Sequence, residues 1–272
     1  MNRFLLLLAM SFSLSGTTAM ACGPDMACRI DAASEYRVSP PPGWDGKKPI
    51  GAFVFVHGHR SNAAEMIQYT ELVEAVHSFG FMLVTPQGLG DTWSTPGSPG
   101  AGRRDEVAYM ARLLDDLTQR FPIDSKRIVG SGFSQGASVI WEIACKGDGR
   151  FAAFVPVAGV WWQPMPVDCT APARPMLHIH GTADRVMPMA GRTLRDWRQG
   201  DVLQAFATMK RVNACPVEPT RSEQKGVLNC AMSETCGSGK PLALCLHDGD
   251  HHTNPAWFKA VQEWLMQVLA TG

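Results

Sequence analysis

Short, continuous apolar runs alternate along the chain with stretches that are apolar on one side only. Six runs rich in Val, Ile, Leu and Phe predict buried strands, at residues 52–56, 81–85, 127–130, 154–157, 176–179 and 242–246. Runs of this kind are typical of parallel strands that are covered on both faces. The pattern therefore predicts an α/β fold, with a mostly parallel sheet and helices on both faces.

Helical periodicity is clearest in two segments. Residues 105–120 carry an apolar stripe at i, i+3, i+4 and i+7, formed by Val107, Met110, Ala111, Leu114 and Leu117. The C-terminal segment repeats the pattern with Phe258, Val261, Leu265 and Val268. Residues 36–38 precede a run of three prolines and predict an antiparallel edge strand, because proline blocks its continuation.

Two connections are long and rich in Gly, Pro and Trp, at residues 87–102 and 159–175. Loops of this length inside a compact domain are usually functional. In an open α/β sheet both follow the carboxyl ends of strands, where ligands bind. Trp93, Trp161 and Trp162 are therefore candidates for an apolar substrate-binding wall; the alternative is that they cap the core.

The first residues predict an export signal. Arg3 precedes an apolar run at residues 4–14, and Ala19-Met20-Ala21 provides a small-residue cleavage pattern. The run is shorter than the roughly 20 residues that a transmembrane helix needs. We expect a signal peptide at residues 1–21, a single catalytic domain at residues 22–272, and a secreted or periplasmic location. Cys22 follows the cleavage site directly, so a lipid anchor at this residue is the alternative.

Charge gives no indication of a polyanionic partner. Lys and Arg number 25, Asp and Glu number 25, and no basic cluster is present. An electrostatic footprint for nucleic acid or for an anionic membrane surface is therefore missing. We expect a monomer with no nucleic-acid partner and no transmembrane segment.

All eight cysteines lie beyond the cleavage site, and no CxxC motif occurs. An even number of cysteines in an exported chain favours disulfides over metal thiolates or redox dithiols. A hairpin that turns at residues 237–239 brings Cys230 opposite Cys245, with a register that can slip. The expected pairs are Cys22 with Cys28, Cys145 with Cys169, Cys215 with Cys236, and Cys230 with Cys245.

Residues 132–136 read Gly-Phe-Ser-Gln-Gly and directly follow the predicted strand at residues 127–130. This is the pattern of a nucleophile elbow, a sharp strand-to-helix turn that exposes a serine hydroxyl to a base and to oxyanion-binding amides. Gly132 and Gly136 allow the bend and the close packing of strand and helix. The motif predicts Ser134 as a nucleophile at the start of an apolar helix.

An acid and a base follow Ser134 in the order that the α/β-hydrolase arrangement requires. Asp184 comes shortly after the predicted strand at residues 176–179, and His251 follows the last strand in a turn that contains Gly249. Asp184 is expected to orient the imidazole, and His251 to deprotonate Ser134. His252 remains the alternative base, and the weaker acid candidates are Asp168, Asp248 and Asp250.

The sequence His57-Gly58-His59 after the first central strand predicts the second half of an oxyanion hole. The expected donors are the backbone N–H groups of Gln135 and His59. A metal site is the alternative, because His57/His59 and His178/His180 are i, i+2 pairs on strands. The downstream acid and histidine of a binuclear motif are missing, so we expect neither a metal nor a cofactor.

In these motifs the chain resembles exported α/β-hydrolase esterases of the polyhydroxybutyrate depolymerase and feruloyl esterase type. The stretch at residues 178–184 is the most specific part of the resemblance. Residues 248–253 depart from it, since they replace a glycine run and a Trp-Pro pair. The other matching segments are residues 36–38, 42–46, 56–58, 105–107, 132–136, 151–153, 156–159 and 213–215.

The resemblance implies the roles of nucleophile, acid and base for Ser134, Asp184 and His251. It also implies recurring cysteines at the pairs Cys145/Cys169 and Cys215/Cys236. By the same resemblance, we expect a serine esterase that acts through an acyl-enzyme on hydroxyalkanoate (polyhydroxybutyrate-type) oligomers or similar short esters, since no additional polymer-binding domain is evident. The alternative is a carbohydrate esterase for feruloyl or acetyl groups of xylan. A peptidase and a non-catalytic binding protein are less favoured.

Overall fold

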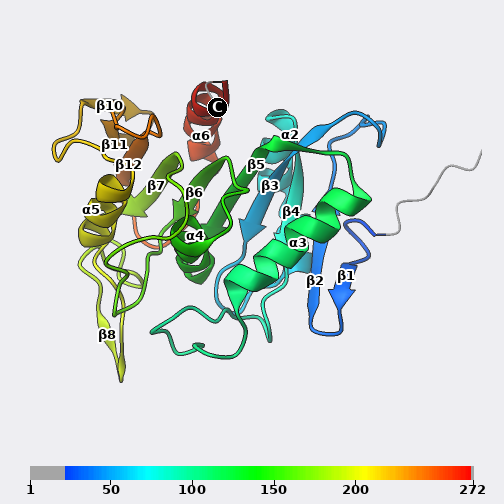
Figure 1. The fold of residues 1–272 in the computed structure, drawn as a ribbon, viewed down its shortest axis with the longest axis horizontal. Coiled ribbons are helices and arrows are strands. Elements are labelled where there is room, and N and C mark those ends of the chain that lie inside the picture. The colour runs from blue at the N-terminus through cyan, green and yellow to red at the C-terminus, as the bar shows by residue number, and fades with distance from the viewer. Residues whose placement is uncertain (1–21, 271–272) are drawn as a thin grey trace, which may run out of the picture.

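The computed structural model describes residues 22–270, so the expected signal peptide at residues 1–21 lies outside the described residues. Ten strands form one mixed sheet in the order β1-β2-β4-β3-β5-β6-β7-β12-β11-β10 (Figure 1). The six strands from β4 to β12 in this order are parallel to one another. They are β3 (Ile50–Val56), β4 (Phe81–Pro86), β5 (Ile123–Phe133), β6 (Ala153–Val157), β7 (Met176–Gly181) and β12 (Leu242–His247). Each contains one predicted run, so the predicted parallel core is confirmed.

Antiparallel strands extend the sheet on both sides. They are β1 (Cys28–Asp31) and β2 (Ser34–Ser39) on one side, and β11 (Leu228–Ser233) and β10 (Arg221–Lys225) on the other. The predicted strand at residues 36–38 lies in β2, but the expectation that it forms the edge is wrong. Strand β1 pairs outside it, with Cys28 opposite Tyr36. A separate small hairpin joins β8 (Thr193–Leu194) to β9 (Trp197–Arg198).

Helices cover both faces of the sheet. They are α1 (Ala63–Gln68), α2 (Thr70–Ser78), α3 (Glu106–Arg120), α4 (Gln135–Lys146), α5 (Val202–Val212), the short 3₁₀ helix η1 (Pro255–Trp257) and α6 (Phe258–Ala270). The predicted helix at residues 105–120 is α3, with Asp105 as its N-cap accepting from the Ala108 amide. Helices α1, α2 and α5 were not predicted.

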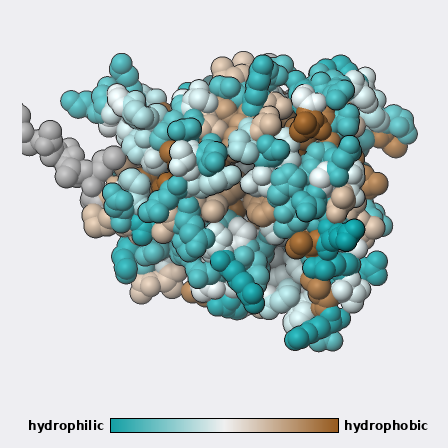
Figure 2. Space-filling model, turned by 180° about the vertical axis from the view of Figure 1, so that it is seen from behind, coloured by the Kyte–Doolittle hydropathy of each residue, from teal (hydrophilic) through white to brown (hydrophobic). Residues whose placement is uncertain are grey.

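Successive side chains of β3 point to opposite faces of the sheet and so contribute to two separate hydrophobic cores. Ala52 and Val54 pack with residues of α3, α4 and α5, whereas Phe53 and Phe55 pack with residues of α2 and α6. Figure 1 shows α3 and α4 in front of the sheet and α2 and α6 behind it. Seen from behind, the outer surface is mostly hydrophilic, with scattered hydrophobic residues (Figure 2).

Four disulfides join the cysteine pairs that were expected, and they leave no free cysteine among the described residues. Cys230 and Cys245 lie opposite each other on β11 and β12. The Cys145–Cys169 bond ties the end of α4 to the loop after β6. Such links restrict the unfolded chain more than the folded one and so stabilise the fold. Within residues 22–270, no helix has the length and apolar character needed to cross a membrane.

Candidate active site

Ser134 lies in the turn between β5 and α4, in a strained backbone conformation with φ 58° and ψ −120°. The turn is held by close backbone contacts that only glycine permits. A Cβ atom on Gly136 would lie 2.1 Å from the Val56 carbonyl oxygen, and one on Gly159 would lie 2.1 Å from the Ser134 carbonyl oxygen. The serine is therefore fixed at the carboxyl end of a central strand, as a nucleophile elbow requires.

Three strand ends bring the predicted triad together. The His251 Nε2 atom lies 2.8 Å from the Ser134 hydroxyl oxygen, and His251 Nδ1 lies 2.7 Å from Asp184 Oδ2. Ser134 follows β5, Asp184 follows β7, and His251 follows β12, next to β7 in the sheet. Both distances are within hydrogen-bond reach, so a proton can pass from the hydroxyl to the imidazole.

The carboxylate of Asp184 is buried and held on both oxygens. Oδ1 accepts from the backbone amides of Val186 and Met187, at 2.8 and 2.7 Å, while Oδ2 faces His251. Burial alone raises the pKa of Asp184, but the bond from His251 and these two amides outweigh it and hold the pKa below its usual value. An ionised Asp184 keeps the proton on His251 Nδ1, which leaves Nε2 free to accept from Ser134.

The alternative candidates lie elsewhere. His252 Nδ1 contacts Asp250 Oδ1 at 3.0 Å, and its ring packs against His247 and Trp257. Asp168 accepts from the Cys169 amide, and Asp248 is an exposed residue. The structure thus places His251, rather than its neighbour, between the serine and a carboxylate.

The two histidine pairs that form the alternative metal site, His57/His59 and His178/His180, are engaged in hydrogen bonds. His57 Nδ1 donates to the Gly58 carbonyl at 2.8 Å, and Nε2 accepts from the Gly88 amide at 3.0 Å. His178 Nε2 lies 3.0 Å from His180 Nδ1, and His180 Nε2 donates to the Met187 carbonyl at 2.7 Å. Residues 22–270 contain no group of three or more His, Cys, Asp or Glu side chains arranged to hold a metal. Instead, His180 supports the loop that carries Asp184.

The two residues expected to supply the oxyanion donors both line a cavity at the nucleophile. Gln135 is the first residue of α4, so its N–H has no acceptor within the helix and lies at the positive end of the helix dipole. His59 lines the same cavities as Ser134. Thr92, which no sequence pattern indicates, contacts the side chains of both Gln135 and His59. Its hydroxyl donates to Gln135 Oε1 at 2.9 Å and lies 3.3 Å from His59 Nδ1.

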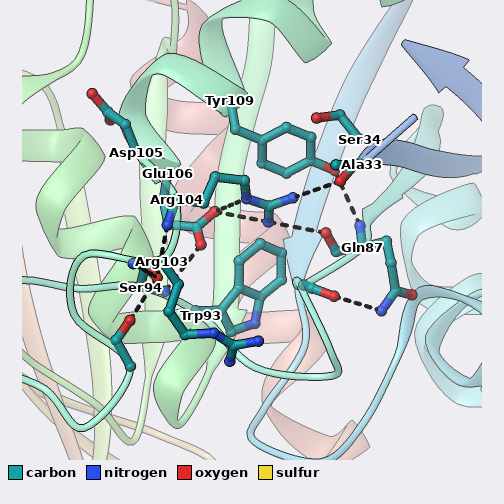
Figure 3. A network of polar contacts seen from close by, with 12 residues as sticks. Ala33, Ser34, Gln87, Trp93, Ser94, Arg103, Arg104, Asp105, Glu106 and Tyr109 are labelled. Atoms are coloured by element: carbon teal, nitrogen blue, oxygen red, sulfur yellow. Dashed lines mark hydrogen bonds and ion pairs between the residues drawn. The ribbon is translucent and has the colours of Figure 1, made fainter. Parts of the chain in front are cut away.

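A buried ion pair anchors the loop that carries Thr92. Arg104 Nη2 lies 2.8 Å from Glu106 Oε2, and the guanidinium sits 3.8 Å from the centre of the Tyr109 ring and 5.6 Å from that of Trp93 (Figure 3). Glu106 Oε1 accepts from the Ser94 amide. Burial raises the pKa of Glu106, and Arg104 opposes that rise. The pair thus ties the start of α3 to residues next to the nucleophile.

Two cavities meet at Ser134. The first, which we call the Trp162 cavity, has a volume of about 430 Å³; the second, the Tyr69 cavity, has a volume of about 520 Å³. Both include His59, Ser134 and Val186. The Trp162 cavity adds polar side chains, namely Thr92, Arg103, Gln135, Arg192 and Gln199. The Tyr69 cavity is more apolar, with Phe55, Met66, Tyr69, Phe133 and His251.

Of the three tryptophans expected to form a substrate wall, only Trp162 lines a cavity at Ser134. Trp93 and Trp161 are fully buried, so this part of the expectation is wrong for them. Trp93 donates through Nε1 to the His57 carbonyl at 2.9 Å, and Trp161 packs edge-on against Trp141. Trp93 still supports the site, because its carbonyl accepts from the Gln135 side chain at 3.1 Å.

Sequence reasoning missed the segment after Asp184. This segment, which includes the β8–β9 hairpin, supplies Val186, Met187, Arg192, Leu194 and Gln199 to the Trp162 cavity. It has no helical or alternating pattern, and its only signal is its position beyond the carboxyl end of β7.

Comparisons with known proteins identify relatives of this chain by sequence. The sequence profile of a family described as Phospholipase/Carboxylesterase matches residues 101–213. Feruloyl esterase B of Piromyces equi is 25% identical over 225 residues, which cover 78% of this chain and 41% of that protein. Probable feruloyl esterase C of Aspergillus niger is 22% identical, with 92% of this chain and 90% of that protein covered. The chain thus spans about two fifths of the length of the first relative.

Solved structures share the architecture. An acetyl xylan esterase from Aspergillus awamori superposes with a TM-score of 0.60 at 15% identity, covering 94% of this chain and 99% of that one. A carboxylesterase from Bacillus cereus gives a TM-score of 0.58 at 14% identity, covering 88% of this chain and 96% of that one. These likenesses confirm the predicted α/β-hydrolase fold. The family profile and the related sequences carry the names of carboxylic ester hydrolases, which is the class that the sequence predicts.

Proposed function

We propose that this α/β-hydrolase cleaves carboxylic esters through an acyl-enzyme on Ser134, and that its substrates are acyl groups carried by carbohydrate. The observation that supports the chemistry is the continuous contact from the Ser134 hydroxyl through His251 to Asp184, at 2.8 and 2.7 Å. Such an arrangement activates an alcohol that is otherwise a weak nucleophile.

In the acylation step, His251 Nε2 takes the Ser134 proton as the serine oxygen attacks the ester carbonyl. The negative charge that forms on the carbonyl oxygen faces the amides of Gln135 and His59. Asp184 stabilises the resulting imidazolium. His251 then gives its proton to the leaving alcohol, and the acyl group stays on Ser134.

In the deacylation step, the same imidazole takes a proton from water, and the resulting hydroxide attacks the acyl carbonyl. The second tetrahedral intermediate uses the same two amides. When it collapses, Ser134 recovers its proton from His251 and the carboxylic acid is released. The chain's own side chains and amides supply every group that these steps need.

The choice of carbohydrate esters rests on the relatives. Three relatives that match 92%, 88% and 89% of this chain are named feruloyl esterase C or probable feruloyl esterase C. A bifunctional acetylxylan esterase/xylanase from Neocallimastix patriciarum is 30% identical over 114 residues. These names favour the carbohydrate-esterase alternative over the hydroxyalkanoate esters that the sequence first suggested. We therefore propose feruloyl or acetyl esters of xylan-type carbohydrate as substrates.

Ser134→Ala tests the chemistry. The variant should fold normally and lose nearly all activity on p-nitrophenyl acetate, by a factor of about 10³ or more. A fluorophosphonate should label the unaltered protein and not the variant. Ser222→Ala, at an exposed position on β10, is the matched control and should keep full activity. Wild-type turnover by Ser134→Ala would refute the proposal.

A substrate panel tests the carbohydrate assignment. Purified protein should hydrolyse methyl ferulate or acetylated xylan faster than hydroxybutyrate oligomers of similar size. Faster hydrolysis of the oligomers would return the assignment to hydroxyalkanoate esters and leave the serine mechanism intact.

We also propose that the protein is exported. Four disulfides are typical of chains that fold in an oxidising compartment. Cys22 is bonded to Cys28, so its thiol is not available for the lipid anchor considered from the sequence. Mass spectrometry of the exported protein should find Cys22 near its N-terminus, joined to Cys28 and without a lipid.

A further inference from the structure

Two arginines line the Trp162 cavity without a partner of their own. Arg103 comes from the loop between β4 and α3, and Arg192 from the segment between β7 and β8. Both are exposed, and within residues 22–270 neither guanidinium makes a hydrogen bond, an ion pair or an aromatic contact. In Figure 3 the Arg103 side chain points away from the buried Arg104–Glu106 pair. Two positive charges thus remain free in a cavity that Ser134 also lines.

No acidic side chain balances these charges inside the cavity. The lining of the Trp162 cavity includes no Asp or Glu, and the lining of the adjoining Tyr69 cavity includes none either. The carboxylate of Asp184 is buried, and His251 and two backbone amides already bind its oxygens. A ligand that enters the Trp162 cavity therefore meets two cations without counterions.

The excess of positive charge extends over the loops around the cavity. Between residues 185 and 200 the chain has four arginines and a single acid, Asp196. Figure 1 shows the β8–β9 hairpin and the loop before α3 at the same end of the sheet. The arginines of residues 22–270 whose side chains lack a partner all follow the carboxyl end of β3, β4 or β7; they are Arg60, Arg103, Arg185, Arg192, Arg195 and Arg198.

The remaining arginines of the described residues each have a hydrogen bond or an ion pair. The chain as a whole carries no net charge. The free arginines come from three separate segments, so the sequence shows no basic cluster. The fold alone brings them to the end of the sheet where the nucleophile lies.

We propose that the Trp162 cavity binds a carboxylate that the substrate carries close to its ester bond. This inference rests on the proposed esterase function and directs it toward anionic esters. A guanidinium offers a carboxylate two parallel N–H donors, and Arg103 and Arg192 offer them from two separate loops. A dicarboxylic acid would supply the carboxylate on the acyl side of the ester, and a uronic acid residue would supply it on the alcohol side.

The test compares kcat/KM for pairs of esters that differ in charge. The acyl pair is mono-4-nitrophenyl glutarate and 4-nitrophenyl glutaramate, and the alcohol pair is 4-acetoxyphenylacetate and its amide. Ser134→Ala gives the background rate of each ester. The anionic ester of at least one pair should be preferred about fivefold or more at about 20 mM salt, and less than about twofold at about 0.5 M salt, because salt screens exposed charges. The pair that shows the preference identifies the side of the ester that carries the carboxylate.

Two variants assign the preference to these arginines. Arg103→Gln and Arg192→Gln each remove one charge and keep a polar side chain. Each should lower the preference several-fold, and the double variant should bring the two esters of a pair to nearly equal kcat/KM. Lys126→Gln makes the same change in charge at an exposed position near the opposite end of β5 from Ser134, and it should leave the preference as it is.

The outcomes separate this inference from the proposed function. Equal kcat/KM within both pairs at low salt, from a protein that hydrolyses p-nitrophenyl acetate, would overturn the carboxylate site and leave the esterase intact. A preference that the double variant retains would also overturn it, since the charge would then act from elsewhere. No hydrolysis of any ester would overturn the proposed function itself.

Discussion

Replacing Arg104 by methionine probes the ion pair that anchors the loop beside the nucleophile. The arginine and glutamate side chains are 9% and 3% exposed. Methionine keeps much of the apolar stem but removes the charge. It leaves the Glu106 carboxyl buried without its cation, and the Gln87 carbonyl loses a donor at 3.1 Å.

Breaking one partner of a buried pair typically costs about 3–5 kcal/mol, because the other charge stays buried and unpaired. Glu106 can escape part of this cost by protonation, since burial already raises its pKa. We therefore expect Arg104→Met to lower the free energy of unfolding by about 3 kcal/mol at pH 7. With Arg104 absent, Glu106 binds a proton more readily in the folded state than in the unfolded state. The loss in free energy of unfolding of the variant should therefore shrink as the pH falls toward about 4.5.

Urea unfolding followed by tryptophan fluorescence measures these values by linear extrapolation. The double variant Arg104→Met/Glu106→Gln carries no buried charge and should recover a large part of the lost stability. Arg103→Met, at the exposed neighbouring residue, should stay within about 0.5 kcal/mol of the unaltered protein. A cost below about 1 kcal/mol for Arg104→Met, or a double variant no more stable than the single one, would refute the reasoning.

Two further predictions concern the histidines. His251→Ala should reduce esterase activity about as much as Ser134→Ala, whereas His252→Ala should stay within several-fold of the unaltered rate; activity assays that rank the two variants in the opposite order would contradict the assignment of the base. Burial, reinforced by the neighbouring His180, holds the pKa of His178 well below its usual value, so below about pH 6.5 the unfolded chain takes up a proton that the folded chain does not. His178 alone should then lower the free energy of unfolding by about 1.4 kcal/mol for each pH unit below this value. The variant His178→Phe should therefore show a weaker dependence of the free energy of unfolding on pH between about pH 6.5 and 5.5, measured by urea unfolding. Parallel plots of this free energy against pH for the two proteins would show that His178 does not cause the loss of stability.

The central sheet and the order of the site residues could be predicted because they follow from local patterns. A buried parallel strand is a continuous apolar run, and the Gly-x-Ser-x-Gly turn restricts the backbone around Ser134 through its two glycines. Strand β10 reads Arg-Ser-Glu-Gln-Lys and has no apolar pattern. It is a strand because β11 provides a partner, which the local sequence does not reveal.

The choices left open in the site depended on contacts between distant segments. His251 and His252 are adjacent in one turn, and only the approach of Asp184, 67 positions earlier, separates their roles. Tryptophan serves packing and ligand binding equally well. Trp93 is buried and donates a hydrogen bond to the His57 carbonyl. Trp162 forms a β-bridge with Gln199, and both residues line the Trp162 cavity.

The composition of β10 also bears on how copies of the chain meet. Arg221 pairs with Glu223 and Glu234, and Lys225 pairs with Glu223 and Glu263, so the outermost strand is bordered by ionised groups. A strand from a second molecule would have to strip water from these charges before it could add to the ladder. The charges along β10 therefore disfavour edge-to-edge association of two molecules at this edge of the sheet.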